Sequence, residues 1–241
     1  MSTSKFDQFQ FPSQAILIIS CTMVFGILGL VLRPPRRAED FEGGERLPLS
    51  CHCKKVQGSL AIPKRSSDSV KPGLHASCLC VDCVKWTRDV CDHGAVDPFG
   101  ASESFVVSPA QVKFEDDSKS LIRQVRLYET RKGTHRMMTS CCKTDVGTFV
   151  DYSSILFLSV GLLSNESERK RMVQDCGPQE WFMAKDRKDS SEFKDNPKVH
   201  RKASLGMILK MIRFSLASSW EMKELPILPV PQEEFIFQRE E

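Results

Sequence analysis

Residues 75–83 read His-Ala-Ser-Cys-Leu-Cys-Val-Asp-Cys, so three thiols fall within six residues in the pattern C-x-C-x-x-C. A C-x-C pair precedes this stretch, and two adjacent cysteines follow it further along the chain. Together the three groups contain Cys51, Cys53, Cys78, Cys80, Cys83, Cys141 and Cys142. Thiolates this close in sequence can converge on a soft divalent ion, and zinc is the usual occupant. The sequence therefore predicts a domain over residues 47–162 that folds around Zn²⁺ held by these cysteines.

A disulfide framework is the alternative interpretation of the cysteines. The chain has 10 of them, and an even number in a secreted protein is typical of paired cysteines. However, C-x-C and Cys-Cys are poor geometries for mutual bridging, because a disulfide needs Cα atoms about 5.5–6 Å apart with suitable side-chain directions. The spacing therefore favours metal, while a secreted disulfide protein or unliganded thiols remain open as alternatives.

The composition is ordinary for a globular chain with appendages. The 241 residues are 41% hydrophobic and 27% charged, and the formal net charge is +3. This length allows one domain with appendages or two small domains, at about 100–200 residues per domain. A nearly balanced charge gives no reason to expect a nucleic-acid partner, which calls for clustered Lys and Arg. The chain also lacks a Gly-rich phosphate loop, a Gly-x-Ser-x-Gly elbow and a His-Glu-x-x-His helix.

Residues 15–32 predict a membrane anchor. These 18 positions carry no charge, which is near the lower limit for spanning a hydrocarbon core of about 30 Å. No small-x-small cleavage site follows, so an uncleaved single-pass anchor is favoured over a signal peptide. Three arginines follow the segment and one lysine precedes it, which places the C-terminal bulk in the cytosol by the positive-inside rule. Residues 1–14 are expected to be disordered, and residues 33–46 to form a linker.

Alternating apolar residues predict short strands between residues 47 and 162. Val56, Gly58, Leu60 and Ile62 fall at every second position, which is strand periodicity. Further strands are expected at 104–107, 112–115, 121–129, 134–138, 148–151 and 155–160. Six or seven short strands separated by turns indicate a mainly β fold, a small zinc-binding β-sandwich or folded-sheet domain.

The C-terminal third divides into three expected parts. Residues 163–202 are dominated by charge and predict a flexible solvated insert. Residues 203–220 carry apolar side chains at helical spacing, and this amphipathic helix either covers the sheet or lies on the membrane surface. The prolines within residues 221–241 predict an extended tail.

The order of the cysteine motifs resembles that of a known superfamily. The series is C-x-C, a strand with a glycine, C-x-C-x-x-C, a β-rich stretch of 57 residues, and Cys-Cys-x-Thr-x-x-Gly. It is similar to the glutathione-dependent formaldehyde-activating enzyme (GFA) family, which includes centromere protein V, and most like an uncharacterised branch of that superfamily. Members of this branch also carry a Cys-Cys-x-Thr block and a basic apolar helix near the C-terminus. The resemblance covers residues 47–160 and, more loosely, 198–232.

The resemblance implies a β-rich zinc fold with two metal positions. In the family, the first C-x-C joins a late C-x-x-C in a closed structural site of four thiolates. Cys51 and Cys53 match the first pair, and Cys142 matches the last ligand of the late pair. Thr139 stands where the family has the other cysteine, so Cys141 is expected to substitute as the fourth ligand.

The family's second site uses the C-x-C-x-x-C thiols, and Cys78, Cys80 and Cys83 match all three. Three protein ligands leave an open tetrahedral position, which is typical of a catalytic zinc. The resemblance implies that this position takes a small thiol such as glutathione or its adduct, in a zinc-dependent carbon–sulfur lyase. If His75 or Asp82 fills the fourth position, the metal is only structural. The alternative function is then a non-catalytic, zinc-stabilised binding module tethered to a membrane.

Other residues near the cysteines carry weaker signals. His52 is a further ligand candidate, although a His between two cysteines on a strand usually points the other way. Trp86 can line a pocket, but an aromatic residue there more often serves packing. Asp89, Asp92 and His93 can offer acid or base groups, although lone loop residues of these kinds are usually solvated. No catalytic residue is assigned from the sequence.

Overall fold

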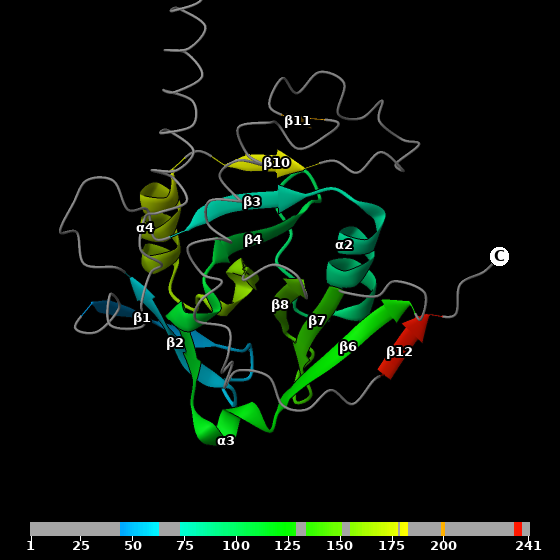
Figure 1. Ribbon diagram of the computed structural model, residues 1–241, viewed down its shortest axis with the longest axis horizontal. Coiled ribbons are helices and arrows are strands. Elements are labelled where there is room, and N and C mark those ends of the chain that lie inside the picture. Colours follow the sequence, from blue (N-terminus) through cyan, green and yellow to red (C-terminus); the bar gives the residue numbers. More distant parts are fainter. Residues whose placement is uncertain are drawn as a thin grey trace, which may run out of the picture. The chain divides into compact units, whose positions relative to one another are not determined.

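The computed structural model describes residues 44–62, 73–128, 134–150, 155–177, 179–182, 199–200 and 234–237. Within these residues the chain forms two sheets, with the strand orders β1-β2-β5 and β11-β10-β3-β4-β9-β8-β7-β6-β12 (Figure 1). The strands are β1 (Glu45–Ser50), β2 (Gln57–Ile62), β3 (Leu74–Cys78), β4 (Ser102–Val107), β5 (Val112–Phe114), β6 (Ile122–Tyr128), β7 (Thr134–Thr139), β8 (Asp145–Val150), β9 (Leu156–Ser159), β10 (Glu180–Phe182), β11 (Val199–His200) and β12 (Glu234–Phe237). The prediction of a mainly β fold is confirmed.

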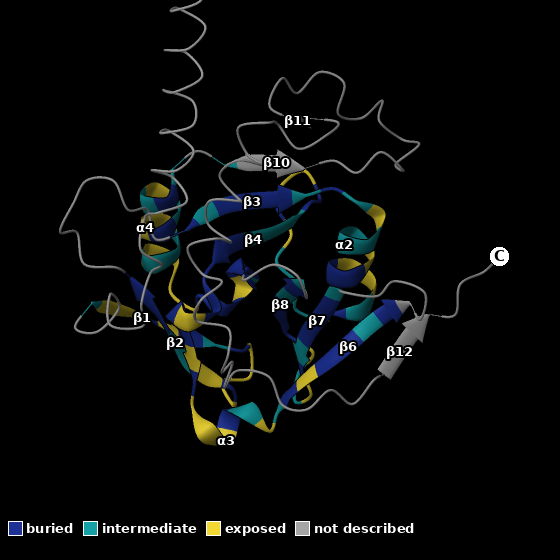
Figure 2. Ribbon diagram, in the orientation of Figure 1, coloured by how far each residue is buried: buried dark blue, intermediate teal, exposed yellow. Residues whose placement is uncertain are grey.

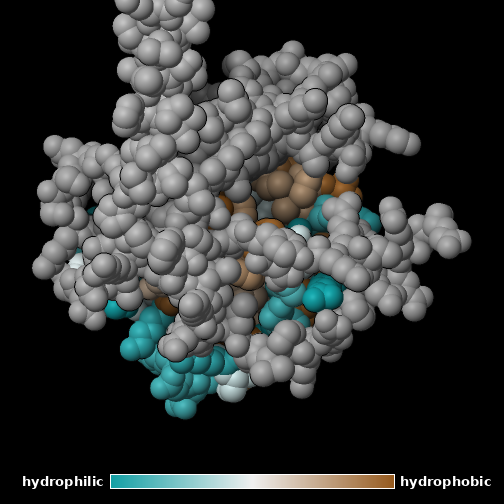
Figure 3. Space-filling model, viewed as in Figure 1, coloured by the Kyte–Doolittle hydropathy of each residue, from teal (hydrophilic) through white to brown (hydrophobic). Residues whose placement is uncertain are grey.

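Both sheets are antiparallel except at the two edges of the large one. There β10 pairs in parallel with β3 and β11, and β12 pairs in parallel with β6. The helical elements are α2 (Val81–Lys85), a π-helical turn at Trp86–Val90, α3 (Asp116–Lys119), α4 (Glu166–Cys176) and two 3₁₀ turns at Pro109–Gln111 and Val160–Leu162. The exposed residues of α3 make its end of the molecule hydrophilic, as the teal surface in Figure 3 shows.

The main core contains residues of both sheets. In β1, Leu47 and Leu49 are buried while their neighbours face outward, because successive strand side chains point to opposite faces. Leu49 and Leu60 of the small sheet join Phe105 and Leu158 of the large sheet in one buried apolar cluster. Figure 2 shows buried residues in dark blue along β3 and β4, of which β4 contributes to this cluster. The cluster fixes the two sheets against each other and so sets the positions of the cysteine-bearing turns.

The structure differs from the expectation of a flexible insert over residues 163–202. Glu166–Cys176 form α4, and Glu180–Phe182 form β10 beside β3. Asn165 caps the helix by accepting the Ser167 N–H at 3.0 Å. Met172 and Cys176 are its buried residues, and they lie one helical turn apart. The other residues of this helix are mostly polar or charged, so its sequence resembles that of a solvated segment.

Several expected segments lie outside the described residues. They are 1–14, the anchor 15–32, most of the linker 33–46, the helix 203–220 and most of the tail 221–241. Within the residues that the structure describes, no helix has the length and apolar character needed to cross a membrane.

Gly147 in β8 occupies a place that a larger residue does not fit. Its φ is +145°, and an added Cβ would lie 2.3 Å from the Phe157 carbonyl oxygen. Gly147→Ala is therefore expected to lower the free energy of unfolding by about 1–3 kcal/mol, measured by urea denaturation. Gly161→Ala is the matched control, because a Cβ there comes no closer than 3.5 Å to a neighbour. Equal stability of the two variants would contradict this account.

Candidate metal centres

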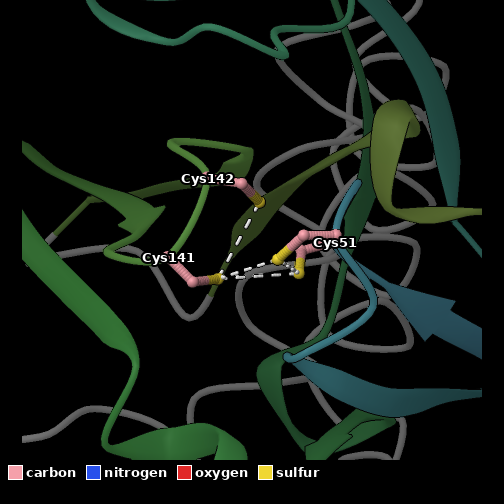
Figure 4. A group of neighbouring side chains, drawn as sticks. Cys51, Cys141 and Cys142 are labelled. Carbon is pink, nitrogen blue, oxygen red and sulfur yellow. Dashed lines mark hydrogen bonds between the residues drawn. The ribbon is translucent and has the colours of Figure 1, made fainter.

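Cys51, Cys53, Cys141 and Cys142 converge between the tips of two β-hairpins, and we call them the four-cysteine group. The first pair follows β1 and the second pair follows β7. All four sulfur atoms lie within 4.8 Å of one another. The Sγ of Cys141 is 3.8 Å from that of Cys51 and 3.4 Å from that of Cys53. Figure 4 shows Cys141 and Cys142 facing Cys51 across the gap between the two turns.

The two hairpin turns have a related construction. Lys54 and Lys143, which follow the two cysteine pairs, both adopt positive φ, at 62° and 47°. This left-handed residue turns the chain back and leaves the preceding thiols at the tip. The Val56 N–H donates to the Cys51 sulfur at 3.3 Å, and the His52 N–H donates to the Thr144 hydroxyl at 3.1 Å. The first bond closes the turn that carries Cys51, and the second links this turn to the one that follows β7.

Two hydroxyls favour the ionised form of one thiol in this group. The Oγ1 atoms of Thr139 and Thr144 lie 3.4 Å and 3.1 Å from the Cys142 sulfur. Burial opposes ionisation, but hydrogen bonds from these two hydroxyls and from the backbone and side chain of Cys53 outweigh it and lower the pKa of Cys142 to about 5. Burial, together with hydrogen bonding to Cys53, raises the pKa of Cys141 to about 12. Thr139, at the position where the resemblance to GFA proteins predicts a cysteine, therefore supports a thiolate instead of supplying one.

The four-cysteine group has the dimensions of a tetrahedral thiolate site. Ion–sulfur bonds of about 2.3 Å in a tetrahedron place the sulfur atoms about 3.8 Å apart. The sulfur of Cys53 lies 3.5 Å from that of Cys51, and the sulfur of Cys141 lies 3.8 Å from those of Cys51 and Cys142. All four thiols are free. The soft donors and their separations fit one metal ion with no further ligand.

Cys78, Cys80 and Cys83 form a second cluster, which we call the three-cysteine group. Cys78 is the last residue of β3, Cys80 is the N-cap of α2, and Cys83 lies in the first turn of that helix. The Cys80 sulfur accepts the Cys83 N–H at 3.4 Å and lies 3.4 Å from the Cys78 sulfur. The three sulfur atoms are all within 4.8 Å of one another. A strand end followed by a helix start thus brings the C-x-C-x-x-C thiols together.

The two expected candidates for a fourth ligand do not join the three-cysteine group. Within the described part of the chain, this group contains cysteines alone. His75 is buried, and its Nε2 lies 2.7 Å from Glu103 Oε1. Asp82 lies in the first turn of α2 but outside the group. The described residues therefore provide three ligand atoms for an ion at this position.

A buried arginine contacts the three-cysteine group from the interior. Arg136 in β7 is 5% exposed, and its Nη2 donates to the Cys83 sulfur at 3.5 Å. Its guanidinium carbon lies 5.7 Å from the centre of the Trp86 ring, a cation–π distance. The Trp86 indole N–H donates to Asp145 Oδ1 at 2.7 Å. Arg136 and Asp145, which belong to no sequence motif, thus lie on the inner side of the three-cysteine group.

The charges of this cluster affect one another. Hydrogen bonds with Cys78 and Cys80, and the nearby Arg136 guanidinium, hold the pKa of Cys83 well below its usual value. Hydrogen bonding with Cys80 raises the pKa of Cys78 well above its usual value. Burial raises the pKa of Asp145 to about 6, although the Trp86 hydrogen bond and the Arg136 charge oppose this. The thiolate nearest the guanidinium is therefore the first of the three to form.

The remaining predicted residues do not join either cysteine group. The rings of His52 and His93 stack with centroids 3.7 Å apart and an interplanar angle of 15°. Together with Asp92 they line a pocket of about 820 Å³ beside the four-cysteine group. Trp86 packs in a buried apolar cluster and donates a hydrogen bond to Asp145, which fits the expectation that an aromatic residue here serves packing. Asp89 is exposed on the π-helical turn.

One family accounts for most of the chain, including both cysteine groups. The family of unknown function DUF6151 matches residues 44–216, and the two cysteine groups and Arg136 lie inside this range. No curated protein matches the chain. The chain belongs to the family of unknown function DUF6151.

Proposed function

We propose that this protein binds zinc at both cysteine groups and processes a thiol-containing small molecule at the three-cysteine group, as a GFA-like carbon–sulfur lyase. The observation that carries the proposal is the convergence of Cys78, Cys80 and Cys83 without a fourth described ligand. A zinc ion held by three thiolates keeps one position that can bind a thiol as thiolate or polarise a carbonyl. The four-cysteine group would then be the structural site.

The substrate class follows from the GFA resemblance. Glutathione and formaldehyde are the proposed reactants, and their adduct, a thiol-bound hydroxymethyl group, is the product. In the forward direction the thiol sulfur bonds to the carbonyl carbon, the carbonyl π bond opens, and the thiol proton ends on the new hydroxyl oxygen. The reverse reaction breaks the same carbon–sulfur bond, and neither direction needs an oxidant or reductant.

The membrane anchor remains part of the proposal. Its support is the uncharged segment 15–32 with three arginines on its C-terminal side. The zinc domain would then face the cytosol, where thiols stay reduced.

Cys80→Ser tests the catalytic assignment. The purified full chain is expected to hold two zinc ions and to turn over the glutathione–formaldehyde adduct. The variant is expected to hold one zinc ion and to lose at least 100-fold in turnover, an order-of-magnitude estimate for the loss of a catalytic metal. Cys91→Ala is the control, because this buried thiol lies outside both groups. Unchanged turnover in Cys80→Ser would remove the three-cysteine group from the chemistry.

A non-catalytic, zinc-stabilised binding module on a membrane is the second candidate function. The four-cysteine group favours it, because four thiolates leave no position for a substrate. X-ray absorption spectroscopy of the zinc protein separates the two candidates. Four protein ligands at both ions support the binding module, whereas one ion with a fourth ligand that exchanges for added thiol supports the enzyme.

A further inference from the structure

Arg136 carries a positive charge to the inner side of the three-cysteine group. Its side chain is almost completely buried, and a buried guanidinium is costly unless negative groups compensate it. The Cys83 sulfur is within hydrogen-bond distance of Nη2, and Cys80 and Asp145 also act on Arg136 electrostatically. The arginine is therefore placed where thiolate charge accumulates.

The geometry holds the guanidinium in one orientation. Arg136 and Thr148 are direct cross-strand partners in β7 and β8, and Nη1 donates to the Thr148 hydroxyl at 3.3 Å. The Trp86 ring lies against the guanidinium. A planar fork with one arm on a hydroxyl and the other on a sulfur is specific to arginine. These protein contacts direct the guanidinium toward Cys83.

The formal charge at this group explains what the arginine can do. A divalent ion with three thiolates has a net charge of minus one, and an anionic fourth ligand would make it minus two. A neighbouring cation within about 4–6 Å favours such anionic forms. Residues that contact the ligands of a metal tune its affinity even though they do not touch the ion.

We propose that Arg136 is a positioning residue of the three-cysteine group, where its guanidinium offsets the excess thiolate charge and favours an anionic over a neutral fourth ligand. This inference rests on the proposed function, because it requires metal at this group. It adds a selectivity: a thiol enters as thiolate in preference to a neutral donor.

The test uses the full chain loaded with Co²⁺, whose visible spectrum reports thiolate ligation. Arg136→Met removes the charge but keeps an apolar stem, and Arg136→Lys keeps the charge but loses the fork. Arg46→Met is the control, since Arg46 is exposed and bonds to Ser59. Chelator competition measures metal affinity at each group, and titrations with glutathione and with imidazole measure binding of an anionic and a neutral fourth ligand.

Arg136→Met is expected to weaken metal at the three-cysteine group by on the order of tenfold and glutathione binding by about tenfold. Imidazole binding and the four-cysteine group should be unchanged. Arg136→Lys should recover most of the glutathione affinity, and Arg46→Met should match wild type.

Wild-type glutathione affinity in Arg136→Met would overturn the proposal. So would an equal loss in Arg136→Lys, because packing would then explain the effect. If Arg136→Met loses metal from both groups, it has not folded, and Arg136→Lys decides: retained glutathione binding supports the proposal and loss overturns it.

Two outcomes separate the enzymatic function from the role of Arg136. If the Arg136 variants show the expected changes but the wild-type protein turns over no adduct, the enzymatic function alone is contradicted. Wild-type protein that takes up no metal at the three-cysteine group overturns both.

Discussion

Replacing Cys142 by serine is expected to remove metal from the four-cysteine group and to abolish cooperative folding of the domain. Structural zinc contributes about 10–16 kcal/mol in small zinc-binding peptides, whereas a folded domain is stable by about 5–15 kcal/mol in total. The four thiols also join the hairpin of β1 and β2 to that of β7 and β8, so their release separates the turns of two sheets. Zinc content and near-ultraviolet circular dichroism measure the outcome.

Cys91→Ala is again the matched control. Cys91 is 4% exposed and packs with Trp86, so the variant loses a buried thiol without losing a ligand. It should keep both metal ions and lose about 1 kcal/mol of stability. A Cys142→Ser protein with full metal content and cooperative unfolding would show that the four-cysteine group is not a structural metal site.

Replacing Asp145 by alanine is expected to lower the free energy of unfolding by about 3–5 kcal/mol, because it removes a buried hydrogen-bond acceptor together with a charge that helps to offset a buried guanidinium. Asp145 is 3% exposed. Its removal leaves the Trp86 N–H without an acceptor and takes a negative charge away from Arg136. Urea denaturation at a fixed free zinc concentration measures the loss, since bound metal itself adds stability.

Two further variants test the cause of that loss. Asp145→Asn keeps an acceptor for Trp86 but not the charge, and it should cost about 1–2 kcal/mol. Asp92→Ala removes an exposed carboxylate 3.9 Å from Lys143, where an ion pair is worth little. If Asp145→Ala is no less stable than Asp92→Ala, the buried carboxylate does not support this part of the fold.

The sequence predicted those strands that turn residues bound, since Ser108-Pro109 follows residues 104–107 and Lys132-Gly133 precedes residues 134–138. Residues 134–138 and 104–107 were expected as strands, and the structure has Thr134–Thr139 and Ser102–Val107. β3 was not expected, because His75, Ala76 and Ser77 are all buried. The strand lies between β4 and β10 inside the large sheet. The sequence of a strand that is covered on both faces does not alternate between apolar and polar residues. In β3 the buried residues also include the polar His75 and Ser77, which weakens the strand signal further.

Local spacing predicted the three-cysteine group, and the resemblance to the GFA family predicted the four-cysteine group, whose pairs lie about 90 residues apart in sequence. The charges behind the three-cysteine group were not predicted. The fit of Cys141 beside Cys142 depends on the turn that Lys143 makes. Arg136 and Asp145 are polar residues in or at the start of alternating segments, which usually means a solvent-facing position. In the structure both faces of β7 are covered, so that His135, Arg136 and Met137 are all buried. Only the packing of Trp86 against this region shows what the charges contact.

The parallel pairing of β12 with β6 has a consequence for how the protein is made. β6 ends at Tyr128, whereas the strand that pairs with its outer edge, Glu234–Phe237, comes more than 100 residues later in the chain. While the ribosome adds the residues between these two strands, the N–H and C=O groups of that edge are unpaired and can form hydrogen bonds with a strand of another chain. Long-range parallel pairing also forms slowly. The nascent chain therefore passes through a stage in which self-association competes with completion of the sheet, and this stage lasts until residues 234–237 have left the ribosome and paired with β6.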